Sequence, residues 1–198
     1  MSERSTQLDP HKFTMVYRGI LYLALLLLFS PSISSKGYDS LRFHQRRTNQ
    51  RSLMFLNKMI GKLHPECLQE RMDFQIPREI VQPRQCQREN ATMIIHEMLQ
   101  QTLILFSSKN ACPDVNDTII EPFLSGIYQQ MLHLEEEMDQ ANSSWESLES
   151  ILRLKNYYQG ITNYLKNKEY SSCACKIVQV ETRRNFSFLY KLTEYLKN

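Results

Sequence analysis

Apolar residues recur every three or four positions along most of this chain, which is the spacing of amphipathic helices rather than of strands. Five such segments follow one another, separated by stretches rich in proline or polar residues. Helices of this kind are too weak to stand alone in water, so we expect them to bury their apolar faces against one another as a bundle. The pattern predicts helices from Tyr38 to Gly61, from Arg88 to Phe106, from Thr118 to Met138, from Ser143 to Leu165 and from Ser172 to the end.

The first helix has the thinnest apolar face, and a long connection follows it. Gly61 is predicted to end this helix. Residues 64–85 then contain Pro65, Pro77 and Pro83, which exclude a continuous helix and predict one irregular crossover. The inward positions of the first helix are expected to be Tyr38, Leu41, Thr48, Ser52, Phe55, Leu56 and Met59.

Two helix starts carry the capping-box pattern, in which a hydroxyl and a carboxylate each satisfy a backbone N–H. Thr118 and Glu121 form this pattern at the third helix, and Ser143 begins the pattern at the fourth. Pro122 lacks an N–H where the third helix would already use one, so we expect that helix to begin a residue or two later. The apolar side of the fourth helix is expected to comprise Leu148, Ile151, Leu152, Tyr158, Ile161 and Leu165.

A hydrophobic run near the amino terminus has a different character. Residues 20–29 are consecutive apolar residues, preceded by an arginine and followed by a stretch rich in serine. A bilayer takes about 20 residues to cross, so this run is too short to span one and is typical of a secretory signal peptide. We expect residues 1–35 to be the signal and residues 36–198 to form one secreted helical domain. Residues 1–14 are polar and form a candidate extension ahead of Met15.

Composition narrows the class of protein. The 198 residues suit a single domain, and 42% hydrophobic with 23% charged residues is typical of a folded chain. Lys and Arg number 24 against 21 Asp and Glu, spread along the sequence, and there is no dense basic block to follow a phosphate backbone. We therefore expect no nucleic-acid partner.

No motif supports catalysis or a metal centre. His96 and Glu97 resemble the start of a zinc-protease motif, but Gln100 stands where the second histidine would be needed. We interpret them as a surface pair. Residues 135–137 are three consecutive glutamates, whose side chains fan around a helix and cannot converge on one ion, so we expect them to face solvent.

The five cysteines become disulfide candidates if the chain is secreted, and their odd number leaves at least one unpaired. Cys86 and Cys112 flank the second helix, about 30 Å apart, which is too far for a bond. Cys173 and Cys175 are two residues apart with divergent side chains, so one of them is expected to reach elsewhere. Cys67 in the crossover is the best partner on spacing, and such a bond would hold the crossover against the last helix.

Five stretches of the chain carry longer sequence motifs, which are CLQERMDFQIP at 67–77, HEMLQQ at 96–101, YQQ at 128–130, YSSCA at 170–174 and LTEYLKN at 192–198. In this order and spacing they resemble the type I interferon family, and the last stretch resembles the beta subtype in particular. The resemblance runs from about Tyr38 to the terminus. It implies an all-α, five-helix cytokine bundle with a long crossover connection, and a secreted, monomeric cytokine without catalysis, cofactor, metal or membrane insertion.

The resemblance also implies a partner and the residues that meet it. The partner is the two-chain type I interferon receptor, and the outcome is antiviral, antiproliferative and immunomodulatory signalling. The implied disulfide joins Cys67 and Cys173. The high-affinity receptor chain would meet Leu68, Arg71, Val180, Arg184 and Phe188. The low-affinity chain would meet Glu97, Gln100, Leu103 and Lys155.

The chain departs from the family pattern at several of these places. Cys175 replaces the family's tryptophan, and we expect it to leave a thiol that competes with Cys173 for Cys67. Other family positions at the two receptor surfaces are replaced by Gln179, Arg183, Asn156 and Gly160.

Four Asn-x-Ser/Thr triplets are candidate glycosylation acceptors in a secreted chain. Asn116 stands at the family's usual glycan position, and it and Asn142 are the expected acceptors. Asn90 and Asn185 lie inside predicted helices. An alternative from another class is a secreted helical carrier that holds an apolar ligand between its helices.

Overall fold

The computed structural model describes residues 40–77, 80, 88–107, 112, 115–138 and 145–196. All described residues lie in one compact unit, Asp39–Asn198. The predicted signal peptide lies outside the described residues. Every regular element among those that are described is helical, which confirms the all-α prediction. The elements are a helix of residues 40–60, η1 (Pro65–Glu70), α3 (Arg88–Ser107), α4 (Asp117–Met138), α5 (Trp145–Asn167), α6 (Ser172–Leu192) and η2 (Thr193–Leu196).

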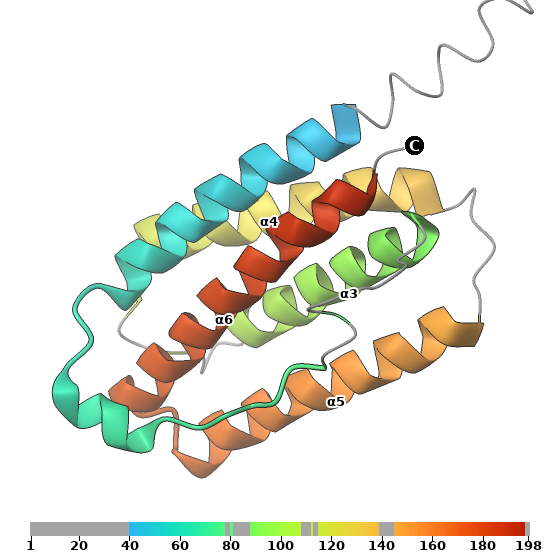
Figure 1. The fold of residues 1–198 in the computed structure, drawn as a ribbon. Coiled ribbons are helices and arrows are strands. Elements are labelled where there is room, and N and C mark those ends of the chain that lie inside the picture. Colours follow the sequence, from blue (N-terminus) through green and yellow to red (C-terminus); the bar gives the residue numbers. More distant parts are fainter. Residues whose placement is uncertain are drawn as a thin grey trace, which may run out of the picture. The chain divides into compact units, whose positions relative to one another are not determined.

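The bundle is organised around α3. This helix contacts α4, α5, α6 and η2, so side chains of four elements meet along it. Figure 1 shows the helix of residues 40–60, in blue and teal, running beside α4 and α6, with the crossover passing α6 and then following α5. The largest fully buried side chains are Tyr158, Phe123, Phe186, Leu56, Ile80, Ile95, Met98, Leu99, Ile127, Leu134, Leu154 and Ile161.

The helix of residues 40–60 ends where the sequence predicts. Gly61 has a φ of +53°, and its N–H donates to the carbonyl of Asn57. A positive φ suits glycine, which has no Cβ to clash. The predicted inward face is only partly right, because Thr48 and Phe55 are half-buried. The buried positions are Leu41, Gln45, Asn49, Ser52, Leu56, Met59 and Ile60.

The start of α4 corrects one prediction. The helix begins at Asp117, not after Thr118, and Pro122 lies inside it. Asn116 is the reason, because its Oδ1 accepts from the backbone N–H of Thr118 at 2.9 Å and from the Thr118 hydroxyl at 2.8 Å. This side chain caps the first turn. The other predicted cap, at Ser143, lies outside the described residues.

Two leucines of α5 are more exposed than the sequence predicts. Leu148 is 45% exposed and Leu152 is 54% exposed, while Ile151 and Leu154 are buried. The buried stripe of α5 contains Ile151, Tyr158, Ile161 and Leu165, as predicted, and also Leu154, which was not predicted. Successive residues of a helix point about 100° apart, so Leu152 faces away from the core that Ile151 meets.

A polar cluster joins α5 to α6 and α3 in the interior. The Tyr157 hydroxyl lies 3.0 Å from Asn185 Oδ1, and Asn185 Nδ2 lies 3.4 Å from the Tyr158 hydroxyl. Tyr158 also meets the Thr102 hydroxyl at 3.3 Å. Burial raises the pKa of Tyr158 to about 12, so both partners of each contact stay neutral at physiological pH.

Candidate functional site

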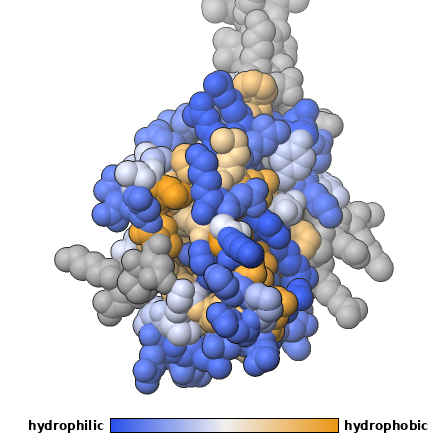
Figure 2. Space-filling model, turned by 90° about the vertical axis from the view of Figure 1, so that its left-hand side faces the viewer, coloured by the Kyte–Doolittle hydropathy of each residue, from blue (hydrophilic) through white to orange (hydrophobic). Residues whose placement is uncertain are grey.

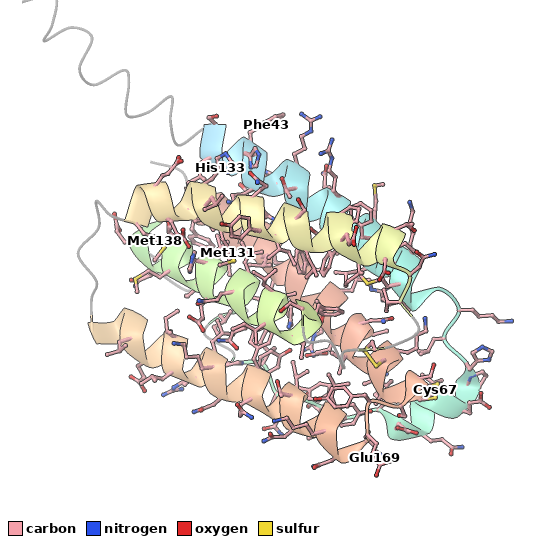
Figure 3. The ribbon with its side chains drawn as sticks, turned by 180° about the vertical axis from the view of Figure 1, so that it is seen from behind. Phe43, Cys67, Met131, His133, Met138 and Glu169 are labelled. Carbon is pink, nitrogen blue, oxygen red and sulfur yellow. A yellow bond between two sulfur atoms is a disulfide. The ribbon has the colours of Figure 1, made fainter. Side chains whose placement is uncertain are left out.

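A disulfide joins the crossover to the last helix. Cys67 in η1 is bonded to Cys173 in the first turn of α6, with a Cα separation of 4.9 Å. The two residues are 106 positions apart in sequence. This is the pair that the resemblance implies, and the spacing argument had left Cys173 and Cys175 open. Figure 3 labels Cys67 at the end of the bundle where the crossover turns back toward α5.

The crossover is also held by α5. The Tyr164 hydroxyl donates to the carbonyl of Glu70 at 2.9 Å, and the Tyr164 ring meets the buried Phe74 ring edge-on at 5.2 Å. Lys168 lies 3.7 Å from the Glu70 carboxylate. Burial, and then the charge of Glu70, raises the pKa of Tyr164, so its hydroxyl remains a donor. The segment is fixed from two sides although it forms no long helix.

Between η1 and α6 lies a groove of about 450 Å³, which we call the composite groove. Leu68 and Met72 are each 50% exposed on its crossover side. Figure 2 looks at the end of the bundle where η1 lies in Figure 1, and apolar surface is exposed there between polar side chains. The groove is lined by Leu63, Leu68, Arg71, Met72, Phe74, Ile177, Val180, Glu181, Arg183, Arg184 and Ser187.

Four of the five residues predicted for the high-affinity receptor chain line this groove: Leu68, Arg71, Val180 and Arg184. Phe188 does not line it, but the Arg184 guanidinium lies 5.5 Å from the centre of the Phe188 ring, so the two surfaces are continuous. Sequence reasoning did not select Met72, although it lies four positions after Leu68 on the same exposed segment.

One carboxylate sits among the cations of the groove. Glu181 accepts from the Tyr157 hydroxyl at 2.7 Å and lies 3.5 Å from Arg184. Burial is the main reason that the pKa of Tyr157 is raised, and the charge of Glu181 adds to it. Glu181 is thereby oriented from the interior. Arg71 is exposed, and no acidic side chain among the described residues forms an ion pair with it.

The second predicted surface lies on α3 and α5. Lys155 Nζ is 3.8 Å from the Glu97 carboxylate, so the fold brings together two of the four residues predicted for the low-affinity chain. Gln100 and Leu103 are half-buried on α3. Ile104, which the sequence analysis did not select, is 57% exposed on the same helix.

Glu97 corrects the interpretation of a surface pair with His96. Glu97 is only 6% exposed, and its Oε1 accepts from Gln101 Nε2 at 2.8 Å. His96 instead lies 2.9 Å from Glu135 on α4. Neighbours on a helix point about 100° apart, so one can face α5 while the other faces α4. No cluster of three metal-ligating side chains occurs among the described residues.

A second disulfide corrects the prediction of a competing thiol at Cys175. Cys175 is bonded to Cys112, which follows α3, with a Cα separation of 5.4 Å. Both residues are buried. The bond ties the connection between α3 and α4 to the first turn of α6. The only signal in the sequence was the presence of further cysteines beside Cys67 and Cys173. Cys86 lies outside the described residues.

The glycosylation candidates differ sharply in access. Asn116 is exposed, and its Oδ1 is used for capping while its Nδ2, the atom that a glycan would modify, has no such role. Asn185 is fully buried within the tyrosine cluster, which excludes modification of the folded protein. Asn142 lies outside the described residues.

Known proteins resemble this chain over almost its whole length. The sequence matches the interferon alpha/beta domain over residues 41–196. Interferon beta of Equus caballus is 44% identical over 188 residues, covering 93% of this chain and all of the relative. Interferon beta of Homo sapiens is 42% identical with the same coverage. The structure of zebrafish interferon 1 superposes with a TM-score of 0.69 at 15% identity, covering 80% of this chain and 99% of the other, which is a likeness of fold.

No helix among the described residues combines the length and the apolar character needed to cross a bilayer.

Proposed function

This chain belongs to the interferon alpha/beta family and is a type I interferon, and from that premise we propose that it is secreted and binds both chains of the type I interferon receptor. Like the family, it is a cytokine and not an enzyme. Binding would bring the two receptor chains together and start antiviral, antiproliferative and immunomodulatory signalling. The predicted signal peptide of residues 1–35 would direct secretion.

The composite groove carries this proposal. It gathers Leu68, Arg71, Val180 and Arg184 from segments far apart in the chain, and the disulfide at Cys67 holds those segments together. Arginine is enriched among the few residues that dominate binding energy at an interface, and two exposed arginines stand here beside partly exposed apolar side chains. We assign this groove to the high-affinity receptor chain.

The surface of α3 and α5 is assigned to the low-affinity chain. Lys155 is half-exposed and Leu103 is partly exposed, so both can touch a partner. The Glu97 side chain is only 8% exposed and pairs with Lys155. Its role is therefore to position the lysine rather than to contact the receptor over a large area. Gln100 lies between Glu97 and Leu103 in the sequence and adds a polar group to this surface.

The groove also argues against the carrier alternative. A site for an apolar ligand is mostly apolar with few polar groups. The composite groove instead carries Arg71, Glu181, Arg183 and Arg184, and family membership already accounts for the fold.

The test is a comparison of two arginine variants in binding to purified receptor ectodomains. Arg71→Ala should weaken the high-affinity chain by about 1–4 kcal/mol, the range of interface hot spots. Arg51→Ala removes another exposed arginine, from the helix of residues 40–60, and should leave that affinity unchanged. Unchanged binding by Arg71→Ala would remove Arg71 from the site. Mature protein that induced no antiviral state in receptor-bearing cells of its own species would contradict the whole proposal.

Glycosylation is proposed at Asn116. A glycan on Nδ2 leaves Oδ1 able to cap α4, so modification and folding are compatible there. Asn142 is the second proposed acceptor. Peptide mapping of the secreted protein would identify the occupied asparagines.

A further inference from the structure

Basic and acidic side chains are segregated among the described helices. α4 contains five acidic residues and neither Lys nor Arg. The helix of residues 40–60 shows the opposite composition, with no Asp or Glu. A chain whose net charge is only +3 therefore has one strongly basic helix. The cations of that helix are Arg42, Arg46, Arg47, Arg51 and Lys58.

Three of these cations form a row along the helix, which we call the basic stripe: Arg47, Arg51 and Lys58. Spacings of four and seven residues place them on one side of the helix, over about 16 Å. All three are exposed, and no carboxylate among the described residues forms an ion pair with them. Arg46 is different, because Glu194 and Tyr190 hold it against the end of α6.

The basic stripe is separate from the composite groove. The side of this helix that meets α6 is marked by Arg46 and by Asn57, which contacts Arg183 at 3.3 Å. Positions 47 and 58 each lie one residue further, about 100° around the helix. A ligand on the stripe would therefore leave Arg71 accessible.

Apolar surface accompanies the stripe. Phe43 is 67% exposed and Met54 is 56% exposed on the same side of the helix, and Figure 3 shows Phe43 at the outer edge of the bundle. Beside them a groove of about 470 Å³ runs between this helix and α4. No carboxylate of the described part of the chain lines it. Its lining residues include Arg51, Met54, Phe55, Pro122, Ser125 and Gly126.

We propose that the basic stripe and the groove beside it bind a sulfated polysaccharide of the glycosaminoglycan class. This inference rests on the secretion in the proposed function, because sulfated polysaccharides are the abundant linear polyanions outside cells. Guanidinium groups pair with tetrahedral oxyanions through two hydrogen bonds, and a row of cations matches sulfates that repeat along a chain. Phe43 and Met54 can pack against sugar rings. The carboxylates of α4 repel the polyanion, so it lies along the helix of residues 40–60.

Binding to immobilised heparin over a range of salt concentrations tests this assignment. The triple variant Arg47→Ser, Arg51→Ser, Lys58→Ser should bind at least about tenfold more weakly at 0.15 M salt, with a shallower dependence on salt, because fewer counterions are released. The control variant Arg153→Ser, Lys166→Ser, Lys168→Ser removes the same net charge from and just after α5, and should bind nearly as the parent does. Desulfated heparin should not bind. Circular dichroism and thermal unfolding check that each variant is folded, and Arg51→Ser alone replaces the triple variant if that one is unstable.

The outcomes separate this inference from the proposed function. Heparin binding that falls equally in both triple variants would report net charge alone and overturn the assignment. A parent protein that does not bind heparin would also overturn the assignment. So would a parent protein that binds a DNA duplex as tightly as it binds heparin. Receptor-ectodomain binding is measured on the same samples, and the stripe variant should retain it. Loss of heparin affinity with receptor affinity intact supports the stripe, whereas failure to bind receptor with heparin affinity intact contradicts only the proposed function.

Discussion

The two surfaces assigned to the receptor are held together in different ways. The composite groove combines an irregular segment with α6, and a covalent bond joins them across 106 residues of sequence. The surface of α3 and α5 consists of two helices that touch through side chains such as Glu97 and Lys155. A helix satisfies its own backbone hydrogen bonds, so packing is enough to place it. An irregular segment has fewer bonds of its own and depends on a crosslink.

The tyrosine cluster lies beneath both surfaces. Tyr157 supports Glu181 in the composite groove, and Tyr158 contacts Thr102 on α3. Asn185 connects the two tyrosines. The difference in how the two surfaces are held together can therefore be tested at three places. These are the Cys67–Cys173 disulfide, the tyrosine cluster that both surfaces share, and the packed helices α3 and α5.

The largest effect is expected from breaking the covalent joint. The double variant Cys67→Ser, Cys173→Ser should lose about 2–4 kcal/mol of unfolding free energy, because the unfolded chain gains the freedom of a long loop. Affinity for the high-affinity receptor chain should fall at least about tenfold, with little change for the low-affinity chain. Denaturant unfolding and binding to each ectodomain measure the two effects.

The matched control for that experiment is Cys112→Ser with Cys175→Ser, which removes a disulfide that does not reach the composite groove. It should destabilise the protein without a selective loss on either receptor surface. Equal losses of both affinities in the Cys67 variant would contradict the claim that only the composite groove depends on this disulfide.

The second largest effect is expected from a change in the tyrosine cluster that both surfaces share. Asn185→Ala removes one hydrogen-bond partner from each of the buried Tyr157 and Tyr158 hydroxyls. Each of these two hydrogen bonds contributes about 0.5–1.5 kcal/mol, so the free energy of unfolding should fall by about 1–3 kcal/mol. Thermal or denaturant unfolding reports the loss. Asn163→Ala removes an exposed amide of α5 and should change stability little. If both variants were equally stable, the cluster would not be a structural link between the surfaces.

A smaller effect is expected in the packed helices. Glu97→Gln removes the charge beside Lys155 but keeps a hydrogen-bonding group for Gln101. Stability should fall by no more than about 1 kcal/mol, and the affinity of the low-affinity chain should change while that of the high-affinity chain does not. Glu149→Gln breaks an exposed pair with Arg153 on α5 and is the control. An effect confined to the high-affinity chain would show that Glu97 has been assigned to the wrong surface.

The smallest expected effect is a gain in stability. Gly160 lies inside α5, and a Cβ added there would meet nothing within 4 Å. Gly160→Ala should therefore stabilise the helix by about 0.5–1 kcal/mol, through the lower entropy of the unfolded chain. A thermal melt measures the gain. A loss of stability instead would mean that the space above Gly160 is occupied in solution.

The spans of the helices were largely predictable from the sequence. Which residues each helix buries was less predictable. The predicted spans of α3, α5 and α6 begin within two residues of the observed ones, because apolar periodicity and caps act locally. To predict which side of a helix is buried, one must know which other helices pack against it. Leu148 and Leu152 have the apolar character of core residues, but each remains exposed on the surface of α5. Asn49 is polar, yet it is fully buried because the helix packs on that side.

The candidate site was predictable in its members and not in its geometry. The family resemblance selected Leu68, Arg71, Val180 and Arg184, and the structure places all four along one groove. Glu181 in the middle of that groove was not selected. Its position depends on Tyr157, which lies 24 residues away in sequence and approaches it only when α5 packs on α6.

By itself, the sequence determined the helical class, the family and the approximate extent of each helix, since these depend on residues close together in the chain. Only the tertiary structure decided that Cys175 bonds Cys112, that Glu97 is buried beside Lys155, and that one helix presents its cations as a stripe. Those outcomes depend on which surfaces of distant segments meet. Packing energy decides that for the whole chain at once, and no local pattern of residues records it.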